Sequence, residues 1–525
     1  MNKPALSLII ACSLLLPTTA WASPNEDLRK GIKTGQPELV RQALLEGTNP
    51  NQLVKIIPNT WTPLMWAAND GNVELVKLLL DKGAEPNDYR EEFDGITALE
   101  LAAKGGHLEV VELLLEKDAY LDASALFWAA NNGHLDIVKL LLDKGASLKN
   151  KDREGCTAFM LAAKEGHLNI VKLLLDKGAS LKNKDRHGYT VLSLAAEGGN
   201  LEVIRFLLTK GLDPKAKSEN GDTALMQAAY HGHLDVMTLL LAKGADMKDT
   251  QDDGTTLLMA SARGGNLDAV KLLLDKGADP KAKNNSGYTT LMAAAEGGDL
   301  DVVKLLIGKG ADPKAKDHSG YTTLMAAAKS GNLDMVRLLL DKGADPKAKT
   351  DYGQTALMSA AESGNIDIVK LLIDKGTSPK DKDRDAYYTK ALIEAVEVGN
   401  LEIAKLLLEK GADPNAQNEF EFPVLMRAAY DSNLDIVKLL LDKGADPKAK
   451  AELLSVSTVL MDAVEAQHLE MVNLLIEIGA DDERKTALQT AVSDGYLEMV
   501  TLLLDKGTDS REKEYLSNIA LIQAA

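Results

Sequence analysis

The sequence predicts a mostly α-helical solenoid of stacked helix–turn–helix units, and three observations lead to that fold class. Glycine recurs at every thirty-third position through the middle of the chain, with no insertion. Each period holds two short apolar segments with helical spacing. Hydrophobic residues make up 45% of the 525 residues but aromatic residues only 4%, which suits small helices packed side by side. A fixed period of about 20 to 50 residues indicates a solenoid, in which each unit contacts only its neighbours. The periodic glycines are Gly133, Gly166, Gly199, Gly232, Gly265, Gly298, Gly331 and Gly364.

One unit, residues 320–349, shows how the period becomes structure. Thr322 is a good N-cap for a first helix whose leucine and alanines point inward. A glycine and an asparagine at 331–332 break this helix, and apolar residues over 333–340 then follow helical spacing in a second helix. We expect Gly343 to stop the second helix as its C-cap residue.

The connectors between units carry turn residues. Proline follows aspartate at 345–346 and glycine follows serine at 319–320, so we expect the chain to form a hairpin there. The repeat spacing falls to 27 between Gly106 and Gly133, and we expect the finger to be missing at this point. It falls to 28 between Gln467 and Gly495, with the same expectation, and rises to 35 after Gly364 and after Ser432.

These units resemble the ankyrin-repeat family. The family pattern G-x-T-P-L-H-x-A-A-x-x-G-H-x-x-V-V-x-x-L-L-x-x-G-A-D is almost complete from Thr62 to Ala84, and it recurs along nearly the whole chain. The resemblance implies helix–turn–helix units joined by β-hairpin or loop fingers. The family histidine that normally links neighbouring repeats by hydrogen bonds is absent here, so we expect thioether packing instead. Met replaces it at positions 65, 160, 226, 259, 292, 325, 358, 426 and 461.

The leader pattern and the repeat spacing together divide the chain into five parts. We expect a signal peptide at 1–22, a degenerate N-terminal capping repeat at 23–57, ankyrin repeats at 58–122, a regular block of period 33 at 123–378, and irregular repeats with a C-terminal cap at 379–525. Terminal units are expected to be atypical because they cover otherwise exposed apolar faces.

The first residues read as a secretory leader. Lys3 forms a short positive region, residues 5–16 are apolar, and Ala20-Trp21-Ala22 supplies a cleavage pattern, so we predict cleavage after Ala22. The apolar run is too short to span a bilayer. We therefore expect a periplasmic or secreted protein of bacterial type.

Charge narrows the class of partner. The formal net charge is −18, and the lysines are interleaved with acidic residues rather than gathered in a tract. This balance disfavours nucleic acid and anionic membranes and favours a basic partner. We expect a monomer with no membrane span.

The chain offers no motif for chemistry. One Met per repeat fits a helical core better than a Cu(I) site, and Cys156 has no assignable catalytic partners. The four histidines that follow the helix-breaking glycine (His107, His134, His167 and His233) occupy a structural position in ankyrin units. We therefore expect no catalytic, cofactor or metal site, and no enzyme.

One exposed position varies inside a constant frame. It lies two residues before the helix-breaking glycine, at the end of the first helix, which in ankyrin proteins faces the concave groove. Mixed charges with tyrosine and arginine favour recognition of a partner, because such residues anchor interfaces; neutral drift on a solvated face is the alternative. This variable column comprises Asn131, Lys164, Glu197, Tyr230, Arg263, Glu296, Lys329, Glu362, Glu397, Tyr430 and Glu465.

Aromatic residues gather in two irregular connectors. They are Tyr387 and Tyr388 in one, and Phe420 and Phe422 in the other. They form either an interaction hot spot or a filling for a gap left by irregular stacking.

The most direct interpretation is a scaffold that binds a protein of unknown identity through its concave groove and finger tips. The alternatives are a secreted bacterial effector that engages a host protein, and an accessory protein that assists an exported enzyme.

Overall fold

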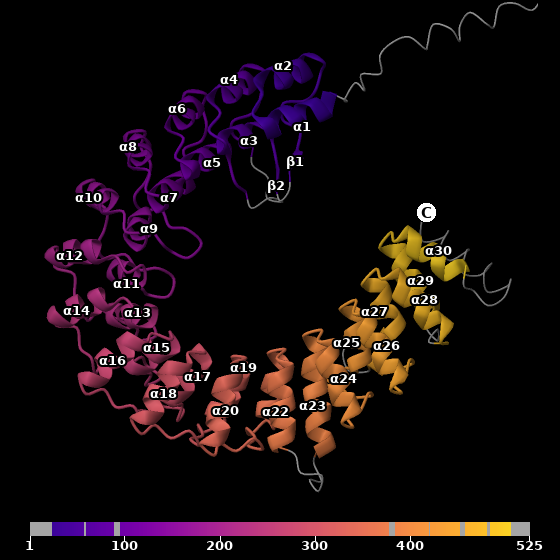
Figure 1. Ribbon diagram of the computed structural model, residues 1–525. Helices are drawn as coiled ribbons and strands as arrows, with labels where there is room; N and C mark the ends of the chain where they lie inside the picture. The colour runs from indigo at the N-terminus through magenta and orange to yellow at the C-terminus, as the bar shows by residue number, and fades with distance from the viewer. Residues whose placement is uncertain are drawn as a thin grey trace, which may run out of the picture. The chain divides into compact units, whose positions relative to one another are not determined.

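The computed structural model confirms a mostly helical repeat architecture (Figure 1). The structure describes residues 24–56, 59–88, 95–376, 384–418, 420–451, 457–479 and 484–505. The predicted signal peptide and the last residues of the predicted C-terminal cap lie outside these ranges. The chain forms two compact units, an N-terminal unit to Met247 and a C-terminal unit from Lys248.

In the N-terminal unit, odd-numbered first helices pack on one another in one layer, and even-numbered second helices form the other (Figure 1). One short antiparallel hairpin, β1 with β2, precedes α3. The elements are α1 (Pro24–Thr34), α2 (Pro37–Leu45), β1 (Val54–Ile56), β2 (Asn59–Trp61), α3 (Pro63–Asn69), α4 (Val73–Asp81), α5 (Ala98–Gly105), α6 (Leu108–Glu116), α7 (Ala123–Asn131), α8 (Leu135–Asp143), α9 (Ala158–Lys164), α10 (Leu168–Asp176), α11 (Val191–Glu197), α12 (Leu201–Thr209), α13 (Ala224–His231) and α14 (Leu234–Ala242).

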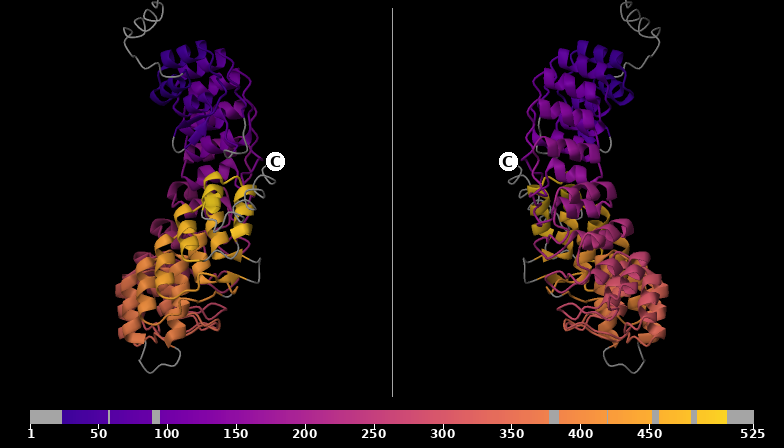
Figure 2. Two further views of the ribbon diagram at one scale, coloured as in Figure 1. Left: turned by 90° about the vertical axis from the view of Figure 1, so that its right-hand side faces the viewer. Right: turned by 90° about the vertical axis from the view of Figure 1, so that its left-hand side faces the viewer.

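The C-terminal unit repeats the same two layers, and its finger loops gather along one side of its helices (Figure 2). Its elements are α15 (Leu257–Arg263), α16 (Leu267–Asp275), α17 (Thr290–Gly297), α18 (Leu300–Gly308), α19 (Thr323–Lys329), α20 (Leu333–Asp341), α21 (Ala356–Glu362), α22 (Ile366–Gly376), α23 (Arg384–Glu397), α24 (Leu401–Glu409), α25 (Val424–Tyr430), α26 (Leu434–Asp442), β3 (Lys450–Ala451), β4 (Ser457–Thr458), α27 (Val459–Glu465), α28 (Leu469–Glu477), α29 (Arg484–Ser493) and α30 (Leu497–Asp505).

A threonine caps most first helices, as the sequence predicts. The Thr322 hydroxyl accepts the Met325 N–H at 3.2 Å, which satisfies one of the unpaired donors at the start of α19. Leu324, Ala327 and Ala328 on this helix are fully buried. The small alanines let neighbouring first helices approach closely, so the core lies between the layers and between successive repeats.

Glycine ends the first helix at the expected place. Gly331 has a φ of +73°, a left-handed conformation that glycine adopts without steric cost. The end of the second helix differs by one residue from the prediction. Lys342 is the C-cap of α20, with a φ of −81°, and the left-handed turn falls on Gly343 directly after it.

In most repeats, the residue after the helix-breaking glycine links the repeat to the one before it. His167 donates from Nε2 to the carbonyl oxygen of Asn131 at 2.8 Å. The C-terminal unit uses asparagine in the same way, since Asn365 donates to the carbonyl oxygen of Gly331 at 3.0 Å. The structural role predicted for these histidines is confirmed, and they supply a side-chain bond between repeats. The methionines at the family histidine position instead lie in the core, except Met461, which is half-buried.

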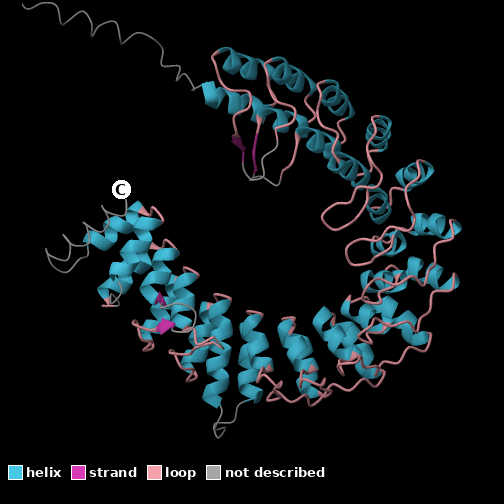
Figure 3. Ribbon diagram, turned by 180° about the vertical axis from the view of Figure 1, so that it is seen from behind, coloured by secondary structure: helices cyan, strands magenta, loops and turns pink. Residues whose placement is uncertain are grey.

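The fingers are narrow hairpins that also contact one another (Figure 3). Lys316 pairs with Thr322 as an isolated bridge, and the Asp317 carboxylate accepts the N–H groups of Ser319 and Tyr321. Successive tips share one backbone bond, as when the His318 N–H donates to the Ser286 carbonyl at 2.9 Å. Each tip thereby braces the next.

One finger is missing in the N-terminal unit, as predicted. Only residues 117–122 join α6 to α7, and Asp122 directly caps α7 by accepting the Ala125 N–H at 3.2 Å. The predicted deletion before α29 includes residues outside the described ranges, and so do the two insertions, near 377–383 and 452–456.

The tip glycine yields a stability prediction. At Gly320, φ is +84° and an added Cβ would lie 2.6 Å from the Lys349 carbonyl oxygen. Gly320→Ala should lower the free energy of unfolding by about 1–3 kcal/mol, because backbone strain and a backbone clash add. Urea unfolding followed by circular dichroism measures this change.

Gly308→Ala is the matched control. Gly308 ends α18 with no atom within 4 Å of an added Cβ and without a positive φ, so alanine should be neutral or stabilise by up to about 1 kcal/mol. Equal losses in both variants would contradict the role assigned to the finger tips.

Candidate functional site

The variable column lies at the last turn of successive first helices. Lys164 and Glu197 end α9 and α11 in the N-terminal unit, and Asn131 and Tyr230 lie at the matching places of α7 and α13. In the C-terminal unit Arg263, Glu296, Lys329, Glu362, Glu397, Tyr430 and Glu465 occupy the same position on α15, α17, α19, α21, α23, α25 and α27. Every one of these residues is at least partly exposed. The column is therefore a row of accessible side chains within each unit.

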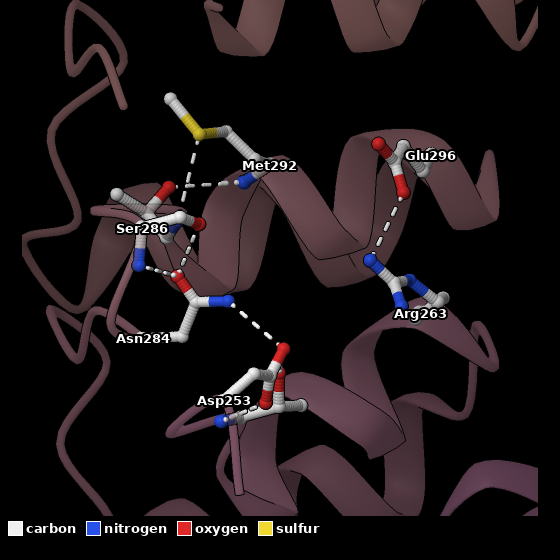
Figure 4. Close-up of polar contacts among 8 residues, drawn as sticks. Asp253, Arg263, Asn284, Ser286, Met292 and Glu296 are labelled. Carbon is white, nitrogen blue, oxygen red and sulfur yellow. Dashed lines mark hydrogen bonds and ion pairs between the residues drawn. The ribbon is translucent and has the colours of Figure 1, made fainter. Parts of the chain in front are cut away.

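Charged members of the column form ion pairs with one another. Lys164 Nζ lies 2.6 Å from Glu197 Oε1 in the N-terminal unit. In the C-terminal unit, Arg263 Nη2 lies 3.2 Å from Glu296 Oε2 (Figure 4), and Lys329 Nζ lies 3.0 Å from Glu362 Oε1. Each pair joins neighbouring repeats. Because the side chains are partly exposed, each pair contributes roughly 0–1 kcal/mol to stability. Their main effect is to orient the side chains.

Arg263 also rests on an aromatic ring. Its guanidinium carbon lies 5.4 Å from the ring centroid of Tyr288, within the range of a cation–π interaction. Tyr321, in the next repeat, is half-buried, and burial followed by the Glu296 carboxylate raises its pKa above the ordinary value. Burial also raises the pKa of Tyr288, so both tyrosines stay neutral at physiological pH.

Tyr189 makes an equivalent polar link in the N-terminal unit. Its hydroxyl donates to Asp222 Oδ2 at 2.7 Å and accepts from Gln227 Nε2 at 3.3 Å. Asp222 is 7% exposed, so this tyrosine bridges two fingers through a nearly buried carboxylate. The bond makes Tyr189 part of the finger framework.

Three column residues near the end of the C-terminal unit differ from the paired ones. Glu397 and Glu465 are exposed, and neither takes part in an ion pair among the described residues. Tyr430 lies between them and is 54% exposed. In the N-terminal unit, Tyr230 is 42% exposed and packs edge-on against His231, with ring centroids 5.0 Å apart.

The four aromatic residues predicted in irregular connectors differ in exposure, so some fill gaps and others can contact a partner. Tyr387 and Tyr388 lie in α23, and Phe420 and Phe422 lie in a finger. Tyr388 is 2% exposed and fills the core, so the prediction of a contact residue is wrong there. Tyr387 is half-buried beneath Lys349, whose Nζ lies 4.6 Å from the ring centroid. Phe420 is 66% exposed at a finger tip, and Phe422, at the base of that tip, is half-buried. Only Phe420 presents most of its ring to a partner.

Two notable residues were missed by sequence reasoning. Tyr352 is 84% exposed at a finger tip, in the same tip position as Phe420. Glu100 stands where most repeats carry methionine, and its side chain is 6% exposed. The break in the methionine series was a visible signal for Glu100, whereas nothing in the local sequence marks the exposure of Tyr352.

Glu100 forms a close carboxyl pair with Asp122. The missing finger places Asp122 at the start of α7, beside α5, which carries Glu100. Burial, together with a hydrogen bond to Asp122 and its charge, raises the pKa of Glu100 to about 8. At neutral pH Glu100 therefore holds a proton, and it can donate that proton to the Asp122 carboxylate.

The remaining candidates for chemistry have structural surroundings. Burial, followed by the charges of Asp152 and Asp185, raises the pKa of the Cys156 thiol to about 12, which suppresses the thiolate needed for nucleophilic attack. Across the described ranges, no group of three or more His, Cys, Asp or Glu side chains is placed to hold a metal ion. Nor is any helix of the described chain long and apolar enough to cross a membrane.

Comparison with known proteins supports the repeat assignment. The family model for "Ankyrin repeats (3 copies)" matches residues 29–125, 120–185, 180–251, 225–317, 291–383, 324–418 and 425–514. "Ankyrin repeat, SAM and basic leucine zipper domain-containing protein 1" of Carollia perspicillata is 41% identical over 73 residues, 14% of this chain and 14% of its own length. The protein of that name from Mus musculus is 43% identical over 60 residues, 11% of this chain and 12% of its own. The chain thus matches only a small part of these relatives.

The raised pKa of Glu100 yields a prediction for stability against pH. The folded state holds the Glu100 proton up to about pH 8, whereas the unfolded state releases it near the ordinary glutamate pKa of 4.5. Stability should therefore fall as pH rises through that window. Glu100→Gln should remove this dependence and stabilise the protein by about 1–3 kcal/mol at pH 9, with little effect at pH 4.

Urea unfolding at both pH values tests this difference. Glu112→Gln on the exposed face of α6 is the control and should shift neither curve. A pH dependence shared equally by the parent and Glu100→Gln would refute the assignment.

Proposed function

Since the chain belongs to the ankyrin-repeat family, we propose that it is a scaffold that binds another protein through the variable column and the finger tips. The observation that supports this most is the column itself, a row of accessible and chemically varied side chains on an otherwise constant frame. Side chains that are already oriented lose less conformational entropy when a partner binds.

The ion pairs give the column its mode of recognition. A partner carboxylate can replace Glu296 on Arg263, and a partner cation can replace Lys329 on Glu362. The displaced Glu296 or Lys329 is partly exposed and can be hydrated, so the exchange buries no unpaired charge. Tyr230 and Tyr430 add exposed aromatic surface of the kind that anchors interfaces. Specificity then depends on the order of charges and rings along each unit.

The partner is most simply a basic protein. A net charge of −18 steers cationic surfaces toward the chain and repels phosphate backbones. We propose that the scaffold acts as a monomer outside the cytoplasm, in the periplasm or after secretion, because residues 1–22 carry a leader pattern. A secreted effector that engages a host protein shares this fold, and cell fractionation separates it from a periplasmic scaffold. An accessory protein that assists an exported enzyme would be revealed by co-purification with that enzyme from periplasmic extract.

The binding role is tested with a double substitution in the column. Tyr230→Ala with Arg263→Ala should reduce recovery of the native partner in affinity capture about tenfold or more, because two anchors are removed. Thermal unfolding should change little, since both side chains are partly exposed. Quantitative mass spectrometry of the captured protein provides the measurement.

Arg337→Ala is the control for this experiment. Arg337 lies on the second helix α20, where it forms an exposed pair with Asp334 at 3.7 Å, so the substitution removes a similar charge away from the column. Unchanged capture by the double variant, or an equal loss in the control, would count against the proposed face.

Export is tested by N-terminal sequencing. The mature protein should begin at Ser23, because the cleavage pattern ends at Ala22. Ala20→Arg with Ala22→Arg should leave the leader attached, because large charged residues do not fit the small-residue pattern. Recovery of the intact leader in the parent protein would exclude this cleavage.

A further inference from the structure

Two exposed aromatic residues lie at opposite ends of one first helix in the C-terminal unit. Phe420 is 66% exposed at the tip of the finger that precedes α25, and Tyr430 is 54% exposed at the C-terminal end of the helix. The seven-residue helix between them is about 10 Å long. Val398, in the turn after α23, adds apolar surface that is 47% exposed. That turn is joined to the turn after Tyr430 by a bond from Asn433 to the Gly399 carbonyl.

The backbone of this finger tip is unusual. Glu421 has a φ of +57°, a conformation that glycine adopts in fingers such as those of Gly287 and Gly320. The Asn418 side chain stabilises the turn by accepting the N–H groups of Phe420 and Phe422, each at 3.0 Å. Glutamate therefore adopts a backbone conformation unfavourable for its side chain, and its exposed carboxylate lies next to Phe420 in the chain.

The charge around α25 is negative. Column residues earlier in the unit are paired, whereas Glu397 and Glu465 on the adjacent first helices α23 and α27 have no ion pair among the described residues. The arginine of α25 itself, Arg427, is neutralised by Asp431 at 2.6 Å. A cation approaching this surface therefore meets unpaired carboxylates, while a phosphate is repelled.

We propose that the α25 face is the docking site for one segment of the partner, and that this segment is basic and carries apolar side chains. The face comprises Phe420, Glu421, Tyr430, Val398, Glu397 and Glu465. The apolar side chains cover Phe420 and Tyr430, and lysines or arginines pair with the carboxylates. This inference rests on the proposed binding function and adds to it the location of the site and the chemistry of the partner segment.

A defined peptide tests the proposal on the full chain. The probe is a fluorescein-labelled 14-residue amphipathic peptide of leucine and lysine, compared with the same peptide carrying glutamate in place of lysine. Fluorescence anisotropy should detect binding of the lysine peptide only. Phe420→Ala with Tyr430→Ala should weaken it about tenfold. Glu397→Gln with Glu465→Gln should weaken it about threefold to tenfold and reduce its salt dependence.

Three further variants distinguish docking from a general effect of charge or folding. Tyr352→Ala removes a tip aromatic that is more exposed than Phe420 and lies outside the α25 face, and it should leave affinity within about twofold. Arg337→Ala removes a charge on α20, outside both the column and this face, and should also leave peptide affinity unchanged. The Tyr230 and Arg263 variant of the capture experiment is measured alongside to show whether the column contributes. Glu421→Gly relaxes the tip, so it should raise the unfolding temperature and still weaken the peptide.

The outcomes separate this inference from the function on which it rests. Parent-like affinity in the Phe420 and Tyr430 variant would overturn the α25 face. If affinity is lost only in the Tyr230 and Arg263 variant, the scaffold function survives and the location is wrong. If no substitution on either surface alters peptide binding or partner capture, both proposals fail.

Discussion

The bond from the turn residue to the preceding repeat sets the register on which the rest of the structure depends. A helix pair this short cannot bury its apolar side alone, so each repeat needs a defined position on its neighbour. His167 and Asn365 provide it by bonding to backbone carbonyls one repeat back. The glycine before each of them makes the turn possible. Because the turns are held in register, the first-helix ends line up and side chains 33 residues apart come within ion-pair distance.

Much of the fold follows from local sequence. Threonine caps, left-handed glycines, the histidine position and the missing finger before α7 are each determined by residues close in the chain. The candidate site was harder to predict from the sequence, because the exposure and pairing of its side chains depend on how neighbouring repeats face one another. The sequence places Lys164 and Glu197 in one column but does not reveal that they pair. The sequence suggests irregular connectors for both Tyr388 and Phe420. The structure instead places Tyr388 in α23, where it is buried, and Phe420 at a finger tip, where it is exposed, because the packing of the repeats decides both.

The ion-paired part of the column and the α25 face are two different kinds of binding surface. Where a lysine or arginine of the column forms an ion pair with a glutamate of the next repeat, the charges already neutralise one another. A partner must then displace one side chain of the pair with a group of the same charge. Around α25, Glu397 and Glu465 have no ion pair within the described part of the chain, and two aromatic rings are exposed. A partner can therefore add contacts there without displacing any. The buried Glu100 shows a third situation, in which a carboxyl group replaces a methionine and its charge is removed by a retained proton. One repeat frame thus supports three electrostatic environments.

The charges of the column alternate in sign over part of the C-terminal unit, which gives this stretch a second, longer period. From Arg263 to Glu362 the charges read positive, negative, positive, negative, so a side chain of the same sign returns only after 66 residues. Excising the unit of Glu296 or of Lys329, or duplicating any one unit of this stretch, would set two cations or two anions side by side. Inserting or removing two consecutive units would preserve the alternation of charge. In this stretch the interchangeable module for recombination, and for engineering longer arrays, is therefore the doublet rather than the single repeat.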